Sequence, residues 1–174
     1  MKKKLTLPVL LLLFFLVNTA FFGCYSFRDV NLDPNVKTVR VQFIENRAAY
    51  VNPQLSPNLT DRLKQKIVNQ TRLSQTNNEN SAHWDISGEI REYSVTTAGI
   101  TSANGQSQTS INRLTVTVHI VKLDNLKSET VEYDITRQFD FDANQSLQSA
   151  EARLLDEMIR NLTDEIFNRL FSNW

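Results

Sequence analysis

The chain has 174 residues, with 19 basic and 19 acidic side chains, two histidines and a single cysteine. One cysteine cannot form an internal disulfide, and the lack of excess positive charge argues against a nucleic-acid partner, whose binding favours a clustered basic surface. A disulfide scaffold is therefore excluded, and no nucleic-acid partner is expected.

The N-terminus has the three parts of a bacterial secretory signal. Lys2 to Lys4 precede an apolar run from Leu5 to Phe22, and Gly23 and the sole cysteine, Cys24, follow. We predict a lipoprotein signal peptide over residues 1–23 and lipid attachment at Cys24, on the sulfur and on the new amino group. The alternative is an uncleaved anchor, because roughly 18 mostly apolar residues are just enough to span a bilayer. Either way, the rest of the chain lies outside the cytoplasm and is tethered to a membrane.

The mature chain of about 150 residues is long enough for one domain with a core, and its net charge is about −3. Residues 24–35 contain Asp33-Pro34 and show no periodicity, so we interpret them as a tether, followed by a single α/β domain over residues 36–174. The domain begins with an alternating stretch, Val36 to Ile44. We expect a strand with Val39, Val41 and Phe43 on its buried face.

Ser56-Pro57 predicts the start of a helix, with a hydroxyl cap and proline at the first helical position. Leu59, Leu63 and Ile67 follow at four-residue spacing with charges between them, which is typical of an amphipathic helix of about 17 residues. A polar break over Gln75 to Ser81 separates this helix from three strand-like segments.

In the first of these segments Trp84, Ile86 and Ile90 share a face, and the apolar phase then slips, which predicts a bulge near Glu92. We predict a loop over Ala98 to Ser110. The second strand has Leu114, Val116, Val118 and Ile120 on one face, and a turn at Asp124-Asn125 leads to the third. The third strand alternates as well, with Arg137 as the one polar residue on its apolar side.

From about Ser146 the apolar period becomes helical and holds for about 27 residues. This helix finishes on three aromatic residues, Phe167, Phe171 and Trp174, at four- and three-residue spacing, hence on one side. Two interpretations stay open: the aromatic residues close the core, or part of the cluster docks on a partner.

The predicted order is strand, helix, three strands, helix. Every strand has one polar face, whereas a parallel sheet covered on both sides would show continuous apolar runs. We therefore predict an α+β fold, a two-layer sandwich in which two helices cover one face of a four-stranded mixed sheet.

Catalytic signatures are lacking in the sequence. It has no Gly-rich phosphate loop, no metal-ligand spacing and no nucleophile elbow. His83 and His119 fall on the polar side of predicted strands, where a solvated or hydrogen-bonded role is expected, and Asp140 and Asp142 fit the solvated edge of a strand. We expect no enzyme, no cofactor and no metal.

Segments in a fixed order along the chain carry a resemblance to a known family. They are Gly23–Phe27, Val39–Phe43, Asn46–Ala48, Val51–Pro53, Gly88–Ile90, Asn112–Val116, Phe139–Phe141 and Glu165–Trp174. Together they resemble the lipopolysaccharide-assembly lipoprotein family LptE, in particular its branch from Bacteroidetes-type bacteria. The C-terminal segment is the most specific of the set.

The resemblance implies an outer-membrane lipoprotein that works with the β-barrel LptD. Members sit partly inside that barrel as a plug, help it to assemble and assist insertion of lipopolysaccharide into the outer leaflet. The lone Asp29 after Cys24, in place of an acidic cluster, implies the periplasmic side of the membrane. The basic positions by which relatives contact lipopolysaccharide cannot be matched to this sequence. The main alternative function is a lipoprotein accessory of an envelope lipid transporter.

Lipopolysaccharide carries anionic groups, so a protein that handles it should present cations and hydrogen-bond donors on adaptable loops. Lys122 and Lys127 flank the Asp124-Asn125 turn, and Arg113 begins the same strand beside the predicted loop. These three are the candidate lipopolysaccharide-binding residues, and ordinary solvated hairpin charges are the alternative.

Overall fold

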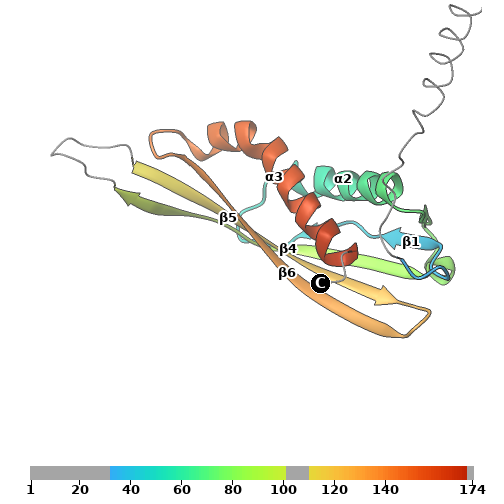
Figure 1. Cartoon of the computed structure of the whole chain (residues 1–174). Helices are drawn as coiled ribbons and strands as arrows, with labels where there is room; N and C mark the ends of the chain where they lie inside the picture. Colours follow the sequence, from blue (N-terminus) through green and yellow to red (C-terminus); the bar gives the residue numbers. More distant parts are fainter. Residues whose placement is uncertain (1–31, 101–109, 172–174) are drawn as a thin grey trace, which may run out of the picture.

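The computed structural model describes residues 32–100 and 110–171 (Figure 1). The signal peptide, Cys24, most of the tether and Trp174 lie outside this part of the chain, so the predictions made for them stay predictions. The strands are β1 (Thr38–Val41), β2 (Glu45–Asn46), β3 (Ser74–Gln75), β4 (Trp84–Ile100), β5 (Ser110–Asp124) and β6 (Glu129–Asp142); the helices are α2 (Leu55–Gln70), α3 (Leu147–Phe171) and a short 3-10 turn, η1 (Glu79–Ser81).

The strands form one mixed sheet of order β3-β1-β4-β5-β6, with β2 also paired to β4. β1 runs parallel to β3 and β4, whereas β4, β5 and β6 form an antiparallel meander. Figure 1 shows α2 and α3 on the same side of this sheet. The predicted α+β class is confirmed, but within the described residues the sheet has six strands and not four, because two-residue strands leave no periodic signal in a sequence.

A bulge divides the first predicted strand in two. Val41 pairs with Ile86, but Glu45 pairs with Glu89, so one extra residue lies on the β1–β2 side of the ladder. Because side chains alternate between faces, one inserted residue turns all that follow to the opposite face. The expected burial of Phe43 is therefore wrong: its side chain is 55% exposed, and Ile44 is buried in its place.

Helix α2 begins slightly earlier than predicted and lacks the expected cap. It starts at Leu55, and the Ser56 hydroxyl is buried without a hydrogen-bond partner. In the turn before the helix, the Asn52 side-chain oxygen accepts the N–H of Gln54 at 3.0 Å and the Asn52 carbonyl accepts the N–H of Leu55 at 3.3 Å. The Asn52 side chain thus orders the turn that leads into α2.

The predicted bulge in β4 is confirmed, since the register with β5 shifts between Ile90 and Glu92. The loop expected over Ala98 to Ser110 is shorter than predicted, because β4 continues to Ile100 and β5 begins at Ser110. Figure 1 shows these long strands extending beyond the two helices. Residues 101–109 lie outside the described part.

The core lies between the helices and the inner face of the sheet. Leu59, Leu63 and Ile67 of α2 are buried, as the four-residue spacing predicted. Arg137 is the polar residue on the apolar side of β6. Its guanidinium donates a hydrogen bond to the Glu165 carboxylate of α3 and forms an ion pair with it. Leu32 also packs against this core, so the predicted tether meets the domain before its final residue.

Candidate functional site

The three candidate lipopolysaccharide-binding cations are not gathered at one place. Arg113 and Lys122 are nine residues apart on β5, which is about 30 Å along a strand. They also differ in face, because odd and even positions of a strand point to opposite sides. Lys122 and Lys127 do lie at the same end, on the two sides of the β5–β6 turn.

Each of these cations already has a partner. The Arg113 guanidinium donates to both carboxylate oxygens of Asp140, at 2.7 and 2.9 Å. The Lys127 ammonium lies 3.6 Å from the Asp33 carboxylate. Lys122 lies over the ring of Trp84, 4.3 Å from its centroid, and burial, with a smaller contribution from nearby Lys127, lowers the pKa of its amine. Each of the three cationic side chains thus has a contact within the domain, and their role in lipid binding stays a prediction.

The turn between the two lysines is held by one buried carboxylate. Asp124 accepts the N–H groups of Leu126 and Lys127, at 3.0 and 3.2 Å, and its other oxygen accepts the indole N–H of Trp84 at 2.9 Å. The Asn125 amide donates to the Ala82 carbonyl at 2.7 Å. The predicted Asp124-Asn125 turn is thus confirmed, and it is tied to the start of β4.

Of the three C-terminal aromatic residues, the structure describes two. Phe167 and Phe171 are both 6% exposed and stack with their ring centroids 4.7 Å apart. Phe171 also packs on Trp84 at 5.6 Å. These two rings contribute to the core, as the first of the two interpretations expects; docking by Trp174 stays a prediction because that residue is not described.

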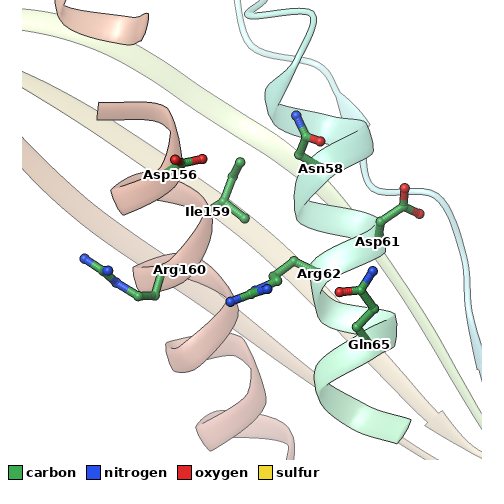
Figure 2. A pocket seen from close by; sticks show the side chains of 7 residues that line it. All are labelled: Asn58, Asp61, Arg62, Gln65, Asp156, Ile159 and Arg160. Carbon is green, nitrogen blue, oxygen red and sulfur yellow. The ribbon is translucent and has the colours of Figure 1, made fainter. Parts of the chain in front are cut away.

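A groove of about 570 Å³ lies between α2 and α3 (Figure 2). Figure 2 shows Arg62 reaching toward α3, whereas Arg160 and Asp61 point away from the space between the helices. Two arginines and two aspartates line the groove, so its charge is balanced. The groove is consequently a poor match for a polyanionic ligand.

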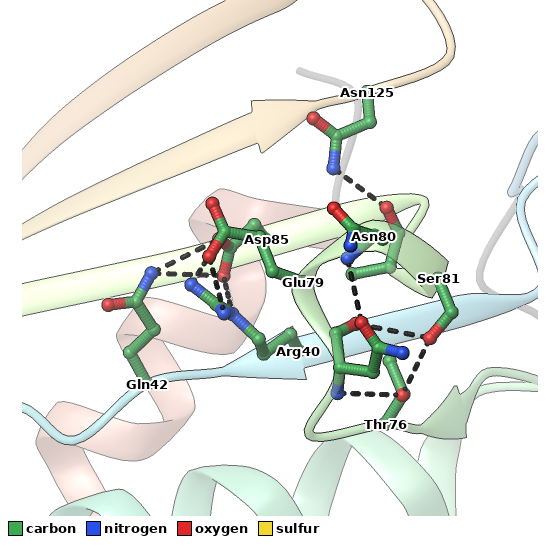
Figure 3. A network of polar contacts seen from close by, with 10 residues as sticks. Arg40, Gln42, Thr76, Glu79, Asn80, Ser81, Asp85 and Asn125 are labelled. Carbon is green, nitrogen blue, oxygen red and sulfur yellow. Dashed lines mark hydrogen bonds and ion pairs between the residues drawn. The ribbon is translucent and has the colours of Figure 1, made fainter.

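On the uncovered side of the sheet, polar contacts bind β1 to the start of β4 (Figure 3). The buried Asp85 carboxylate accepts hydrogen bonds from the Arg40 guanidinium at 2.9 and 3.0 Å and from the Gln42 side-chain amide at 3.1 and 3.2 Å. Arg40 also reaches Glu79 of η1 at 3.1 Å. A buried carboxylate with this many donors is fully compensated, so these contacts fix the strands rather than create a reactive group.

Beyond this cluster, a chain of ion pairs crosses the same outer face. Arg47 lies between Glu45 at 3.0 Å and Glu89 at 3.2 Å, and Arg91 lies between Glu89 at 2.7 Å and Asp134 at 3.5 Å. The hydrogen bond from Arg91, together with the charges of Arg91 and Arg47, holds the pKa of Glu89 below its ordinary value.

The two histidines are hydrogen-bonded, as expected. His119 continues the chain of ion pairs, with Nδ1 2.8 Å from Asp134 and Nε2 3.5 Å from Glu132. His83 accepts the backbone N–H of Lys37 through Nδ1 at 3.0 Å.

A hollow of about 340 Å³ lies among these ion pairs. It is lined by Gln42, Phe43, Glu45, Arg47, Ser87, Gly88, Glu89, Arg91, His119 and Val121. The sequence pattern did not predict this site because it depends on Phe43 facing outward, and the signal for this was the change of phase between Val41 and Ile44.

Within residues 32–100 and 110–171, no group of three or more His, Cys, Asp or Glu side chains is placed to hold a metal ion. The same ranges contain no helix that is both long and apolar enough to cross a bilayer.

Fold and site together define a small two-layer α+β domain with one helix-covered sheet face and one polar, ion-paired face. The model of the LptE family, described as lipopolysaccharide-assembly, matches residues 36–170. The chain therefore belongs to the LptE family of lipopolysaccharide-assembly proteins. A search of curated proteins found no match to the sequence.

Several solved structures are similar to the chain. A putative neuraminyllactose-binding hemagglutinin homologue from Helicobacter pylori is 8% identical with a TM-score of 0.50, over 75% of this chain and 83% of that one. Uncharacterized lipoprotein B from Nitrosomonas europaea is 17% identical with a TM-score of 0.48, over 79% and 83% of the two chains. A minor lipoprotein from Acinetobacter baumannii is 14% identical with a TM-score of 0.44, over 79% and 94%. At such identities, the first of these likenesses concerns the fold alone.

Proposed function

We propose that this protein is an outer-membrane lipoprotein subunit of the lipopolysaccharide translocon, of the Bacteroidetes-type branch of LptE. In this role it is anchored on the periplasmic side through lipid at Cys24. It sits partly inside an LptD-type β-barrel as a plug, assists the assembly of that barrel, and assists insertion of lipopolysaccharide into the outer leaflet. The observation that carries the proposal is the family match over residues 36–170.

The outer face of the sheet supports the placement in a barrel. The interior of a large outer-membrane barrel is polar and wet, so a plug must present polar surface to it. The ion pairs around Glu89 and Asp134 provide such a surface on the side that the helices leave uncovered.

The N-terminal segment supports the anchoring. Burial of acyl chains contributes about 0.8 kcal/mol per CH₂, so two or three chains hold a domain firmly where one does not. Lys127 pairs with Asp33, nine positions after Cys24, so the chain between the proposed anchor and the β5–β6 turn can span about 30 Å at most.

The decisive experiment is purification of the full-length lipoprotein in mild detergent, with identification of the proteins that co-purify and intact-mass analysis of the mature chain. We expect an LptD-type barrel and an acylated Cys24. Cys24→Ser should leave an unprocessed or membrane-released protein, whereas the neighbouring change Ser26→Ala should not. Recovery of lipid-transporter subunits without a barrel, or a mature chain without acylation, would refute the proposal.

A further inference from the structure

The two edges of the sheet differ greatly in length. One edge is β3, with two residues, whereas the other is β6, with fourteen. Within the ranges that the structure describes, β5 is the only strand paired with β6. Figure 1 shows β6 along the margin of the sheet, with both helices over the sheet's inner face. An edge strand presents backbone N–H and C=O groups that its own sheet does not use, and another extended chain can pair with them.

The backbone of β6 is regular along its whole length. Its register with β5 runs without a shift from the pair of Glu129 and Asp124 to the pair of Asp142 and Ile111. The strand contains no proline and no lysine. Natural edge strands are commonly shortened, bulged or interrupted by such residues, because a long regular edge recruits other chains. β6 lacks these protections and is therefore a template for a further strand.

The first half of β6 is its more accessible half. None of the residues from Glu129 to Asp134 is buried, whereas Ile135, Phe139 and Phe141 belong to the core. A charge that points to the inner side also protects an edge strand, and Arg137 lies in the second half, where it pairs with α3. The free template consequently extends from Glu129 to Asp134.

The side chains of β6 decide which chain can pair with this template. The strand has five acidic residues and one arginine. The side chains of Glu132 and Asp134, on the outer side, are 61% and 62% exposed. Like charges that lie directly opposite in neighbouring strands are destabilising, whereas opposite charges are stabilising. An acidic strand, including β6 of a second copy, is therefore disfavoured, and a strand with basic side chains is favoured.

The nearest cations of the domain leave these two carboxylates available. Arg91 lies 2.7 Å from Glu89 but 3.5 Å from Asp134. Glu132 lies 3.5 Å from Nε2 of His119, which carries a charge only when it is protonated. An incoming lysine or arginine would thus meet solvent-facing carboxylate oxygens, whereas the anionic groups of a lipid would be repelled.

We propose that the first half of β6 binds an extended segment of a partner protein, which adds a strand to the sheet and carries lysine or arginine at alternate positions. The backbone of Glu129 to Asp134 provides the main-chain hydrogen bonds, and the carboxylates of Glu132 and Asp134 select the basic side chains. Because β5 holds β6 in place, the ordering cost falls mainly on the incoming segment. This inference goes beyond the proposed function, since it concerns a protein strand at the sheet edge rather than the anchor, the barrel plug or the lipid.

Three synthetic peptides of about eight residues, within the usual length of a strand, test the inference on the full-length lipoprotein in mild detergent. The basic peptide alternates lysine with threonine, the acidic peptide alternates glutamate with threonine, and the proline peptide alternates lysine with proline. Proline cannot donate a backbone hydrogen bond, so the proline peptide keeps the charge but loses the pairing. Fluorescence anisotropy measures binding, amide hydrogen exchange locates it, and light scattering reports the oligomeric state.

Two charge reversals form a matched pair of variants. Glu132→Lys places a cation on the edge strand, and Glu157→Lys makes the same change at an exposed position of α3. We expect the basic peptide to bind and to slow exchange in β6, and the acidic and proline peptides to bind at least about tenfold more weakly. Glu132→Lys should weaken binding of the basic peptide about threefold or more, whereas Glu157→Lys should not. Neither variant should change the melting temperature.

Four results would overturn the inference. They are a basic peptide that does not bind, a proline peptide that binds equally well, an equal loss of binding in Glu157→Lys, and exchange in β6 that is unchanged by the bound peptide. Slower exchange in β6 with rising protein concentration and no peptide would identify a second copy as the occupant, and would overturn it as well. All of these results leave the proposed function intact, because that function is tested by co-purification of the barrel and by acylation of Cys24.

Discussion

Gly88 leaves room for the buried side chains that pack against β4, and Gly88→Ala should destabilise the domain. An added Cβ would lie 2.6 Å from Cδ1 of Ile120 and 3.0 Å from the carbonyl oxygen of His119. Ile120 is fully buried, so its terminal methyl group has little room to move away. The backbone of Gly88 has no left-handed φ, so the effect arises from space alone.

The expected magnitude combines two opposing contributions. Overpacking of a core costs about 1–3 kcal/mol, and replacing glycine within a strand regains about 0.5–1 kcal/mol. The net loss of unfolding free energy should therefore be about 1–2 kcal/mol. For a domain of about 150 residues this corresponds to a fall in melting temperature of about 3–6 °C.

A double-mutant cycle identifies the cause of the loss. Ile120→Val deletes Cδ1 and should cost about 0.5–1.5 kcal/mol alone. In combination with Gly88→Ala it removes the closest clash, so the double variant should be more stable than the sum of the two losses predicts, by about 1 kcal/mol. The His119 carbonyl stays in place, so the rescue should be partial.

Urea denaturation of the chain from residue 24 onward, carrying Cys24→Ser, measures these differences in solution. The variants share one background, so the lack of lipid affects them equally. A Gly88→Ala variant as stable as the parent chain, or two substitutions that are additive within error, would show that overpacking against Ile120 is not the cause.

Three further predictions concern the aromatic cluster and the candidate cations. Phe171→Ala should lower the unfolding free energy by about 3–5 kcal/mol, because a buried ring packed on Phe167 and Trp84 is lost; an unchanged melting temperature would contradict the core assignment. The hydrogen bond and charge of Arg113 lower the pKa of Asp140, so the stability contributed by this pair is present above about pH 3.8, the ordinary Asp value, and is lost as the pH falls through the lower folded value. Arg113→Gln should raise the Asp140 pKa in an NMR titration, and an unshifted titration would contradict the pairing. Lys122→Ala combined with Lys127→Ala should weaken lipopolysaccharide binding and leave barrel association intact, with added salt mimicking the loss; binding that is insensitive to both would place the lipid contact elsewhere.

Much of the fold follows from local periodicity. The amphipathic spacing of Leu59, Leu63 and Ile67 depends only on the helical repeat, and the long alternating strands depend only on the two-residue repeat. These signals span many residues, so the order of the main elements, the α+β class and the bulge near Glu92 could all be read without knowledge of tertiary contacts.

Short elements and the site were decided by the tertiary structure. β2 and β3 have two residues each and exist only because neighbouring strands pair with them. The outward turn of Phe43 depends on one inserted residue opposite β4, a pairing between segments over 40 positions apart. The partners of Arg113 and Lys122, namely Asp140 and Trp84, likewise appear only when β5 lies between β4 and β6 in the sheet. Sequence patterns report which side chains share a face of one element, but the register between elements determines what that face meets.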